Sequence, residues 1–345
     1  MFKWLQRIIN GPADNAPAQP SPPVRTHPAP VAGAAAAAVP GKRPVSFDQV
    51  DRVNNAYDSW LFERADDSGL DLSPLESQVL DALAVIVSSQ QSGAALVRRM
   101  PGLIPQLLQS LRSDSFSGAA LSRTISSDVV LVAAVVRLAN ASYQGTANSI
   151  TSVEHAVMLI GQEGLRQLIT SVAFRPIIDM NSGHYTRTLA LRLWEQAERC
   201  AGANRIVADE LGIDPFEAFL AGLVQNVGLI VALRVMDQVA KNDASLGSAL
   251  FCAQLVRDAR ALSCSIGREW NFPDTVTRAL AEQSGVQKGA QLSPLGQLLM
   301  LTDYLGKVRE LIEHGRLGHA DPSLLAGLPD YTPHLYAALA PAPAP

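Results

Sequence analysis

The sequence has few of the residues from which metal centres and disulfides are built. Its 345 residues include three cysteines and six histidines. The cysteines form no CxxC pair, which excludes the usual zinc and iron–sulfur spacings and favours buried thiols in a reducing compartment. The histidines show neither an H-x₃-H nor an HExxH spacing, so the common helical zinc motifs are absent as well.

Charge and long apolar runs are also scarce. Charged residues make up 17% of the chain and the formal net charge is −4, which gives no electrostatic footprint for nucleic acid. The longest apolar run, VVLVAAVV at 129–136, is far shorter than the roughly 18 residues that a membrane span requires. The N-terminus lacks the apolar region of a signal peptide, so we expect a cytoplasmic protein without a transmembrane segment.

Residues 1–45 differ in composition from the rest of the chain. A short amphipathic peptide, MFKWLQRII, is followed by a stretch in which proline and alanine dominate and almost nothing could fill a core. This stretch is predicted to be a disordered Ala/Pro-rich linker. The peptide itself could dock on a partner, touch a membrane surface, or remain a frayed terminus.

Residues 46–99 are predicted to form an N-terminal helical extension. In FDQVDRVNNAYDSWLFERA, apolar residues recur at three- and four-residue steps and make one helical face. The next helix opens with Ser73 as N-cap, Pro74 at the first helical position and Glu76 completing a capping box. We expect both helices to pack on the part of the chain that follows.

From residue 100 onward the helical periodicity continues, and no convincing alternating strand occurs. The fold is therefore predicted to be all-α, a multi-helix bundle over 100–314. Residues 315–345 are expected to be a C-terminal extension with a disordered tail. The predicted helices of the bundle lie at about 103–112, 117–123, 128–141, 151–158, 162–179, 184–211, 215–222, 223–239, 246–268, 273–284 and 291–314.

Three motifs follow one another in the first part of the bundle: MPGLIPQLLQSL, LSRTISSDVVLVAAVVRLANASYQG and ITSVEHAVMLIGQEGLRQLI. Together with the later helices, they resemble the HDOD family, the HD-related output domain of bacterial signalling proteins. Asp128 and Asn140 stand at the family's Asp and Asn positions, while Val129 replaces its usual proline. We expect Asp128 to cap a buried helix and Asn140 to end it, with a ligand contact as the alternative for Asn140.

The resemblance extends to the positions of the HD metal site, but the metal-binding chemistry is missing. The frame AGLVQNVGLI at 221–230 is similar to "aGLLHDIG", in which metal-dependent HD hydrolases carry a His-Asp pair. Leu229 stands where HD-GYP phosphodiesterases have a lysine. By this resemblance, in an alignment that is ungapped around residue 259, the former metal-site positions are Gln196, Gln225, Asn226, Ala259, Gln283, Ser284 and Asp303.

Of these positions, Asp303 alone retains a carboxylate. Carboxamides are neutral and poor ligands for Zn²⁺, Fe²⁺ or Mn²⁺, and one Asp cannot hold a dinuclear centre or activate a bridging water. Gln and Asn can instead hydrogen-bond each other in a buried pocket. We therefore predict a neutral hydrogen-bonded plug, with no metal, no other cofactor and no enzymatic activity.

Three functions remain open. The resemblance implies a non-catalytic bacterial signal-transduction scaffold or adaptor that acts through protein–protein interaction, with a homodimer as one form it could take. An alternative is a non-hydrolysing sensor of a cyclic di-GMP-like nucleotide, which the lack of clustered arginines near the former metal positions weakens. The third is a residual metal-dependent phosphohydrolase. No nucleic-acid partner is expected.

Overall fold

The computed structural model describes residues 44–63, 71–88, 164, 170, 183–240, 246–284, 290–318 and 322–340. Over these ranges the chain contains no β-strand, and the all-α prediction is confirmed. The helices are α2 (Phe47–Leu61), α3 (Pro74–Ser88), α8 (His184–Ala208), α9 (Pro215–Val224), α10 (Val227–Ala240), α11 (Ala249–Glu269), α12 (Asp274–Ser284), α13 (Pro294–Glu313) and α14 (Thr332–Ala338), with the 3₁₀ turns η3 (Asp209–Leu211) and η4 (Pro322–Leu324). The helices predicted between residues 103 and 179 lie outside the described residues, apart from Gly164 and Thr170, which are helical.

Short polar side chains fix where the helices begin. At α3 the predicted capping box is confirmed: the Glu76 N–H donates to Ser73 Oγ at 3.1 Å, and the Ser73 N–H donates to the Glu76 carboxylate at 2.8 Å. Each such cap satisfies a backbone N–H that has no partner within the helix. Side-chain caps also begin α2, α9, α11 and α13, at Ser46, Asp214, Ser248 and Ser293.

Glu76 also joins α3 to the start of α11. Its Oε1 accepts the N–H groups of Gly247 and Ser248 at 3.0 and 2.7 Å, and its Oε2 accepts the Ser248 hydroxyl at 2.9 Å. Burial opposes the charge of this carboxylate, but the hydrogen bonds from Gly247, Ser73 and Ser248 hold its pKa below the ordinary value. One carboxylate therefore caps two helices and ties the extension to the bundle.

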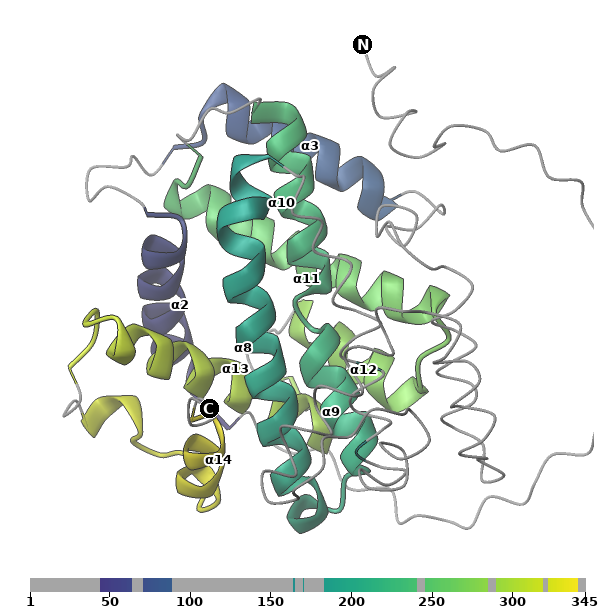
Figure 1. Cartoon of the computed structure of the whole chain (residues 1–345), viewed down its shortest axis with the longest axis vertical. Coiled ribbons are helices and arrows are strands. Elements are labelled where there is room, and N and C mark those ends of the chain that lie inside the picture. Colours follow the sequence, from purple (N-terminus) through teal and green to yellow (C-terminus); the bar gives the residue numbers. More distant parts are fainter. Residues whose placement is uncertain are drawn as a thin grey trace, which may run out of the picture.

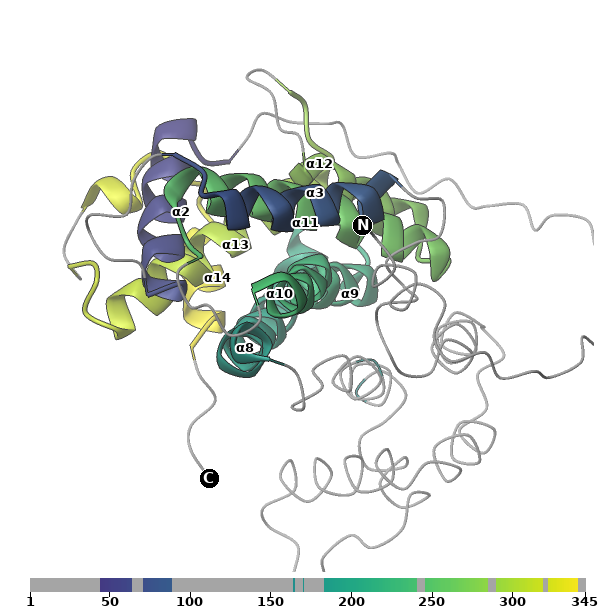
Figure 2. The same cartoon turned by 90° about the horizontal axis from the view of Figure 1, so that it is seen from above.

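The helices are arranged around α8, which runs down the middle of the view in Figure 1 with α2, α13 and α14 to its left. Seen from above in Figure 2, α3 lies across α10 and α11. Buried side chains of α2 and α3, among them Val53, Leu61 and Leu83, belong to the same hydrophobic core as the bundle helices. The expectation that the two extension helices pack on the bundle is thus confirmed. The boundaries assigned to the extension remain predictions.

The C-terminal region contributes to this core as well. Leu324 of η4, Leu335 of α14 and Leu339 just after α14 are each almost completely buried. The Tyr304 hydroxyl of α13 donates to the Leu324 carbonyl at 2.7 Å. Much of the predicted C-terminal extension is therefore folded against α8 and α13.

One described stretch, Pro215–Ala240, is long and apolar enough to cross a membrane by composition alone. Within its most apolar window, 89% of the residues are buried inside the protein. Gln225 and Asn226 form a turn in the middle of the stretch and divide it into α9 and α10. These properties fit two consecutive core helices.

Candidate functional site

The centre of the candidate site is the carboxylate of Asp303 on α13. Asp303 is buried, with 8% of the residue exposed. One of its oxygens, Oδ2, lies 2.8 Å from Nη2 of Arg260 on α11 and 2.8 Å from Nζ of Lys307 one turn further along α13. Burial opposes the charge of the carboxylate, but Lys307 and Arg260 outweigh this effect and hold its pKa below the ordinary value. The Asp303 carboxylate is thus ionised, and the cationic side chains of Arg260 and Lys307 balance its negative charge. We refer to Asp303, Arg260 and Lys307 as the ion-pair cluster.

Helix α2 of the extension closes over the ion-pair cluster. The Lys307 ammonium donates to Asn54 Oδ1 at 2.8 Å and lies 5.5 Å from the centre of the Tyr57 ring. The Tyr57 hydroxyl donates to Gln196 Oε1 of α8 at 2.7 Å. Burial and the nearby Asp303 carboxylate raise the pKa of Tyr57 well above its ordinary value, so the phenol remains a donor.

Gln196 of α8, one of the positions aligned with the HD metal site, packs closely against α13. Its side chain is almost fully buried, and a Cβ placed on Gly306 would lie 3.6 Å from its Nε2 and 3.2 Å from Cys200 Sγ. Burial, together with Asp303, raises the pKa of the Cys200 thiol to about 12, which leaves it unreactive. Nε2 of Gln196 has no hydrogen-bond partner, and a buried donor without an acceptor costs stability.

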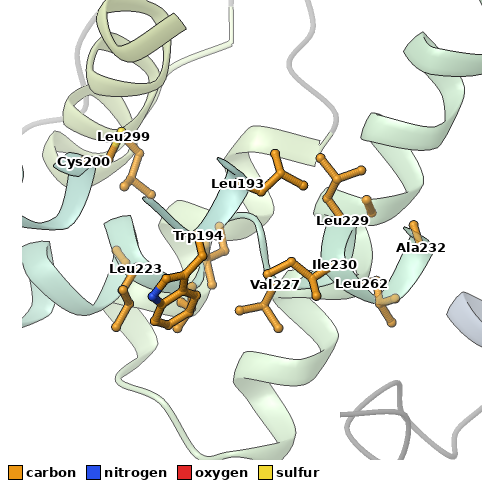
Figure 3. Close-up of a cluster of buried hydrophobic side chains, with 14 of the residues drawn as sticks. Leu193, Trp194, Cys200, Leu223, Val227, Leu229, Ile230, Ala232, Leu262 and Leu299 are labelled. Atoms are coloured by element: carbon orange, nitrogen blue, oxygen red, sulfur yellow. The ribbon is translucent and has the colours of Figure 1, made fainter. Parts of the chain in front are cut away.

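Gln225 and Asn226, at the position of the His-Asp pair, serve mainly through their backbones. The Gln225 carbonyl accepts the Ser263 hydroxyl at 2.9 Å, and the same hydroxyl oxygen accepts the Gly228 N–H at 2.9 Å. The Asn226 carbonyl accepts the N–H groups of Leu229 and Ile230, the first such bonds of α10. Figure 3 shows Leu229 and Ile230 within a cluster of buried apolar side chains. We call the Gln225–Asn226 turn with Gly228 and Ser263 the α9–α10 turn.

The prediction that the carboxamides form a mutually hydrogen-bonded plug is wrong for this pair. Nε2 of Gln225 is buried without a hydrogen-bond partner, so it does not bond to Asn226. The physical reason is that Gln225 closes the last turn of α9 while Asn226 opens α10. The turn between the two helices fixes the backbone and leaves the buried amide no acceptor.

The residues aligned with the later metal ligands have structural roles. The carbonyl of Ala259 lies against Gly228, where a Cβ would come within 1.9 Å of it, so this position is a close crossing of α10 and α11. Gln283 donates from Nε2 to the carbonyls of Ala279 and Gly296 at 3.1 and 3.0 Å and thereby links α12 to α13.

Ser284 and a second contact of Gln283 complete the set. The Ser284 hydroxyl donates to the Ala281 carbonyl at the end of α12. The Gln283 carbonyl accepts a 3.5 Å contact from Arg260, so Gln283 borders the ion-pair cluster. Asp128 and Asn140 lie outside the described residues.

The residues that set the charge of the site were not among those predicted from the sequence. The ungapped alignment selected Ala259, whereas the next residue, Arg260, reaches Asp303. The four-residue step from Asp303 to Lys307 is a signal that could have predicted one of the two ion pairs. The site therefore carries two cationic side chains, although only one of them, Arg260, is an arginine.

The described part of the chain offers no group of three or more His, Cys, Asp or Glu side chains that could hold a metal ion. Asp303, the one carboxylate among the positions that the resemblance aligns with HD ligands, already has two cationic partners on one oxygen. These residues do not fit the dinuclear centre of an HD hydrolase, because such a centre requires several anionic or imidazole ligands free to bind.

The HDOD domain model matches residues 97–286, more than half of the chain. The chain therefore belongs to the HDOD family, as its motifs predicted. A search of curated proteins gives no match.

Solved structures share the fold at low sequence identity. A Marinobacter aquaeolei VT8 protein, described in its name as acting in signal transduction, matches with a TM-score of 0.54 and 19% identity, over 79% of this chain and 65% of its own length. The chain thus spans less than two thirds of that protein. An HDOD domain protein from Geobacter sulfurreducens matches with a TM-score of 0.52 and 17% identity, over 76% of this chain and 96% of its own. A Shewanella amazonensis SB2B protein, named as a metal-dependent phosphohydrolase, matches with a TM-score of 0.51 and 17% identity, over 77% and 98%.

Proposed function

We propose that this HDOD protein is a non-catalytic scaffold or adaptor in bacterial signal transduction that acts through protein–protein interaction. Membership of the HDOD family and the signal-transduction name of the Marinobacter structure support the signalling role. The non-catalytic part rests on one observation, which is that Arg260 and Lys307 both pair with the Asp303 carboxylate.

Electrostatics explains why this observation weighs against a metal enzyme. Two unit charges 4 Å apart repel by about 4 kcal/mol at the effective dielectric constant of about 20 that suits protein sites. A divalent cation beside Asp303 would be repelled by both side-chain cations of the cluster. Each repulsion would be about twice the value for unit charges, because the metal carries two charges. The ion-pair cluster therefore supplies the positive charge that a metal would supply in an HD hydrolase, but without a Lewis acid or a bound water.

Metal analysis of the full-length protein, purified without chelator, tests this proposal. We expect Fe, Mn and Zn far below one ion per chain, and no gain in phosphodiesterase turnover when Mn²⁺ is added. Near-stoichiometric metal, with turnover lost in Asp303→Ala, would instead establish the residual phosphohydrolase.

A second candidate, a nucleotide sensor that does not hydrolyse its ligand, is favoured by the charge balance of the ion-pair cluster. Two cations face one carboxylate, and Arg260 is partly accessible, with 23% of its side chain exposed. Calorimetric titration with cyclic di-GMP and with (p)ppGpp would separate the candidates. Saturable micromolar binding that Arg260→Gln abolishes would favour the sensor, and absence of heat for both ligands would favour the scaffold.

The adaptor role itself requires a protein partner. Affinity capture from the native cell with the full chain and with a chain lacking residues 1–45 should yield a shared set of proteins. A second set should be lost with the N-terminal residues if these recruit partners. Light scattering of the purified chain would determine whether it forms a homodimer. Failure to enrich any protein with either chain would count against the scaffold.

A further inference from the structure

A groove of about 760 Å³ runs along the outer face of α8, apart from the ion-pair cluster. The ends of α13 and α14 border it, and Trp60 at the end of α2 forms part of its wall. Its volume is in the range of pockets that hold ligands of a few hundred daltons, so it could take several side chains of a peptide.

The groove has an apolar base between charged edges. Ile206 is 43% exposed in it, and Trp60 lies against His314 in a tilted arrangement with ring centres 4.5 Å apart. Gly202 forms an open part of the base, because a Cβ there would meet no atom within 4 Å. Four glutamates and three arginines make up the charged lining, namely Glu195, Glu198, Glu310, Glu313, Arg192, Arg199 and Arg205.

Two of the three arginines already have partners within the protein. Arg199 pairs with Glu310 and, at 3.3 Å, with Glu313. Arg192 lies over the Trp60 ring at 5.5 Å and 3.9 Å from Glu63, which is outside the groove. The lining thus has a small acidic excess beside an exposed apolar surface, and a basic amphipathic segment complements both features.

We propose that residues 1–9 of this same chain dock in the groove. The segment carries apolar and basic side chains, and the first acidic residue of the chain is Asp14. These side chains match the apolar base and the acidic edge respectively. They are Phe2, Trp4, Leu5, Ile8 and Ile9 on the apolar side and Lys3 and Arg7 on the basic side.

The chain between the segment and α2 is long enough for this docking. Residues 10–43 separate the segment from the first described residue, Pro44. Even a flexible chain of this length has a root-mean-square span of about 30 Å, and a proline-rich one reaches further. Such a tether holds the segment near the groove at an effective concentration on the order of millimolar, so a weak intrinsic affinity suffices.

Docking would have a regulatory consequence. The residues that could bind a partner or a membrane surface would be covered when they occupy the groove, and a ligand that competes for the groove would release them. Whether residues 1–9 are covered or available to a partner would then depend on what occupies the groove.

Disulfide trapping in the full chain tests the docking. The three native cysteines are buried, so Leu5→Cys combined with Gly202→Cys provides the two reactive thiols. The matched control pairs Leu5→Cys with Ala84→Cys, at an exposed helical position on α3 away from the groove. Under mild oxidation at low protein concentration, we expect an intramolecular disulfide to form about tenfold faster in the groove pair than in the control pair.

Three further outcomes complete the test. Adding Lys3→Glu and Arg7→Glu to the groove pair should reduce its rate towards that of the control. Equal rates for both pairs would overturn the proposal. Predominantly intermolecular disulfides, whose yield rises with protein concentration, would also overturn it and would assign the groove to a second copy of the chain.

Discussion

The ion-pair cluster and the α9–α10 turn both contain residues that the family resemblance aligns with HD metal positions, yet they differ in how they are stabilised. In the cluster, Asp303 keeps its charge, and Arg260 and Lys307 supply the opposite charge. In the turn no charge remains, and the Ser263 hydroxyl bridges backbone groups of Gln225 and Gly228. The aligned residues are thus held by side-chain cations in one region and by backbone contacts in the other, within a single fold.

This difference predicts that the cluster is the more sensitive region to loss of charge. Asp303→Ala leaves Arg260 and Lys307 without their shared partner, and we expect the free energy of unfolding to fall by about 2–4 kcal/mol, somewhat reduced by solvent at Arg260. Urea denaturation measures this change. Glu313→Ala, on the same helix but more exposed and paired with Arg309 and Arg199, is the control and should cost less than about 1 kcal/mol.

The pH dependence of the Asp303 substitution sharpens the same point. The folded-state pKa of Asp303 lies below its ordinary value of 3.8, so the carboxylate contributes stability above that pH. This contribution is lost as the pH falls through the folded-state pKa. The stability difference between the native chain and Asp303→Ala should therefore be constant near neutral pH and shrink below about pH 4. A difference that grows on acidification would show that the carboxylate is not held charged by its partners.

The α9–α10 turn should instead be sensitive to added volume. In Gly228→Ala the new methyl group would lie 1.9 Å from the Ala259 carbonyl oxygen and 2.8 Å from the Ser263 backbone nitrogen. Because both neighbours are backbone atoms that cannot rotate away, we expect a loss of about 2–3 kcal/mol.

Gly202→Ala is the matched control for that substitution, since it makes the same change on a helix where the methyl group meets no atom within 4 Å. It should be neutral or stabilise by up to about 1 kcal/mol, because alanine favours the helix. Thermal unfolding of both variants gives the comparison. Similar losses in the two would mean that helix propensity, and not the crossing of α10 and α11, sets the cost.

A smaller effect is expected where α2 covers the cluster. Tyr57→Phe removes the donor to Gln196 Oε1 and leaves a buried acceptor unsatisfied, which should cost about 1–2 kcal/mol. A double-mutant cycle with Gln196→Leu should give a coupling energy of about 1 kcal/mol. Additive losses would show that Tyr57 stabilises the fold through its ring contacts with Lys307 and the core. They would also show that its hydrogen bond to Gln196 does not contribute.

The sequence predicted the fold of the described helices well, because capping residues and apolar periodicity are local signals. Ser73 and Glu76 form their predicted capping box, and α8 to α13 lie close to their predicted ranges. What composition could not predict is the second role of Glu76 at the start of α11, since that contact joins residues 171 positions apart. Long-range hydrogen bonds of this kind leave no periodic pattern in the chain.

The candidate site was predicted less completely for the same reason. Asp303 and Gln196 were singled out as former metal-site positions and are both buried, but their partners Arg260 and Tyr57 come from α11 and α2. The ungapped alignment selected Ala259, which faces Gly228, whereas the next residue, Arg260, reaches Asp303. Neighbouring residues on a helix point about 100° apart, so the two side chains meet different partners.

The smallest effect is expected from restoring the His-Asp pair in the α9–α10 turn alone. Gln225→His with Asn226→Asp should change stability by no more than about 1 kcal/mol, because the native pair bonds mainly through its backbone. It should bind no metal and hydrolyse no phosphodiester, since Asp303 stays paired with Arg260 and Lys307. Adding Arg260→Gln and Lys307→Gln releases that carboxylate. Mn²⁺ uptake is then measured in the double variant and in the quadruple variant. Uptake by the quadruple variant alone would show that the ion-pair cluster prevents metal binding. Uptake by the double variant would show that the substitutions in the turn alone account for the missing metal site.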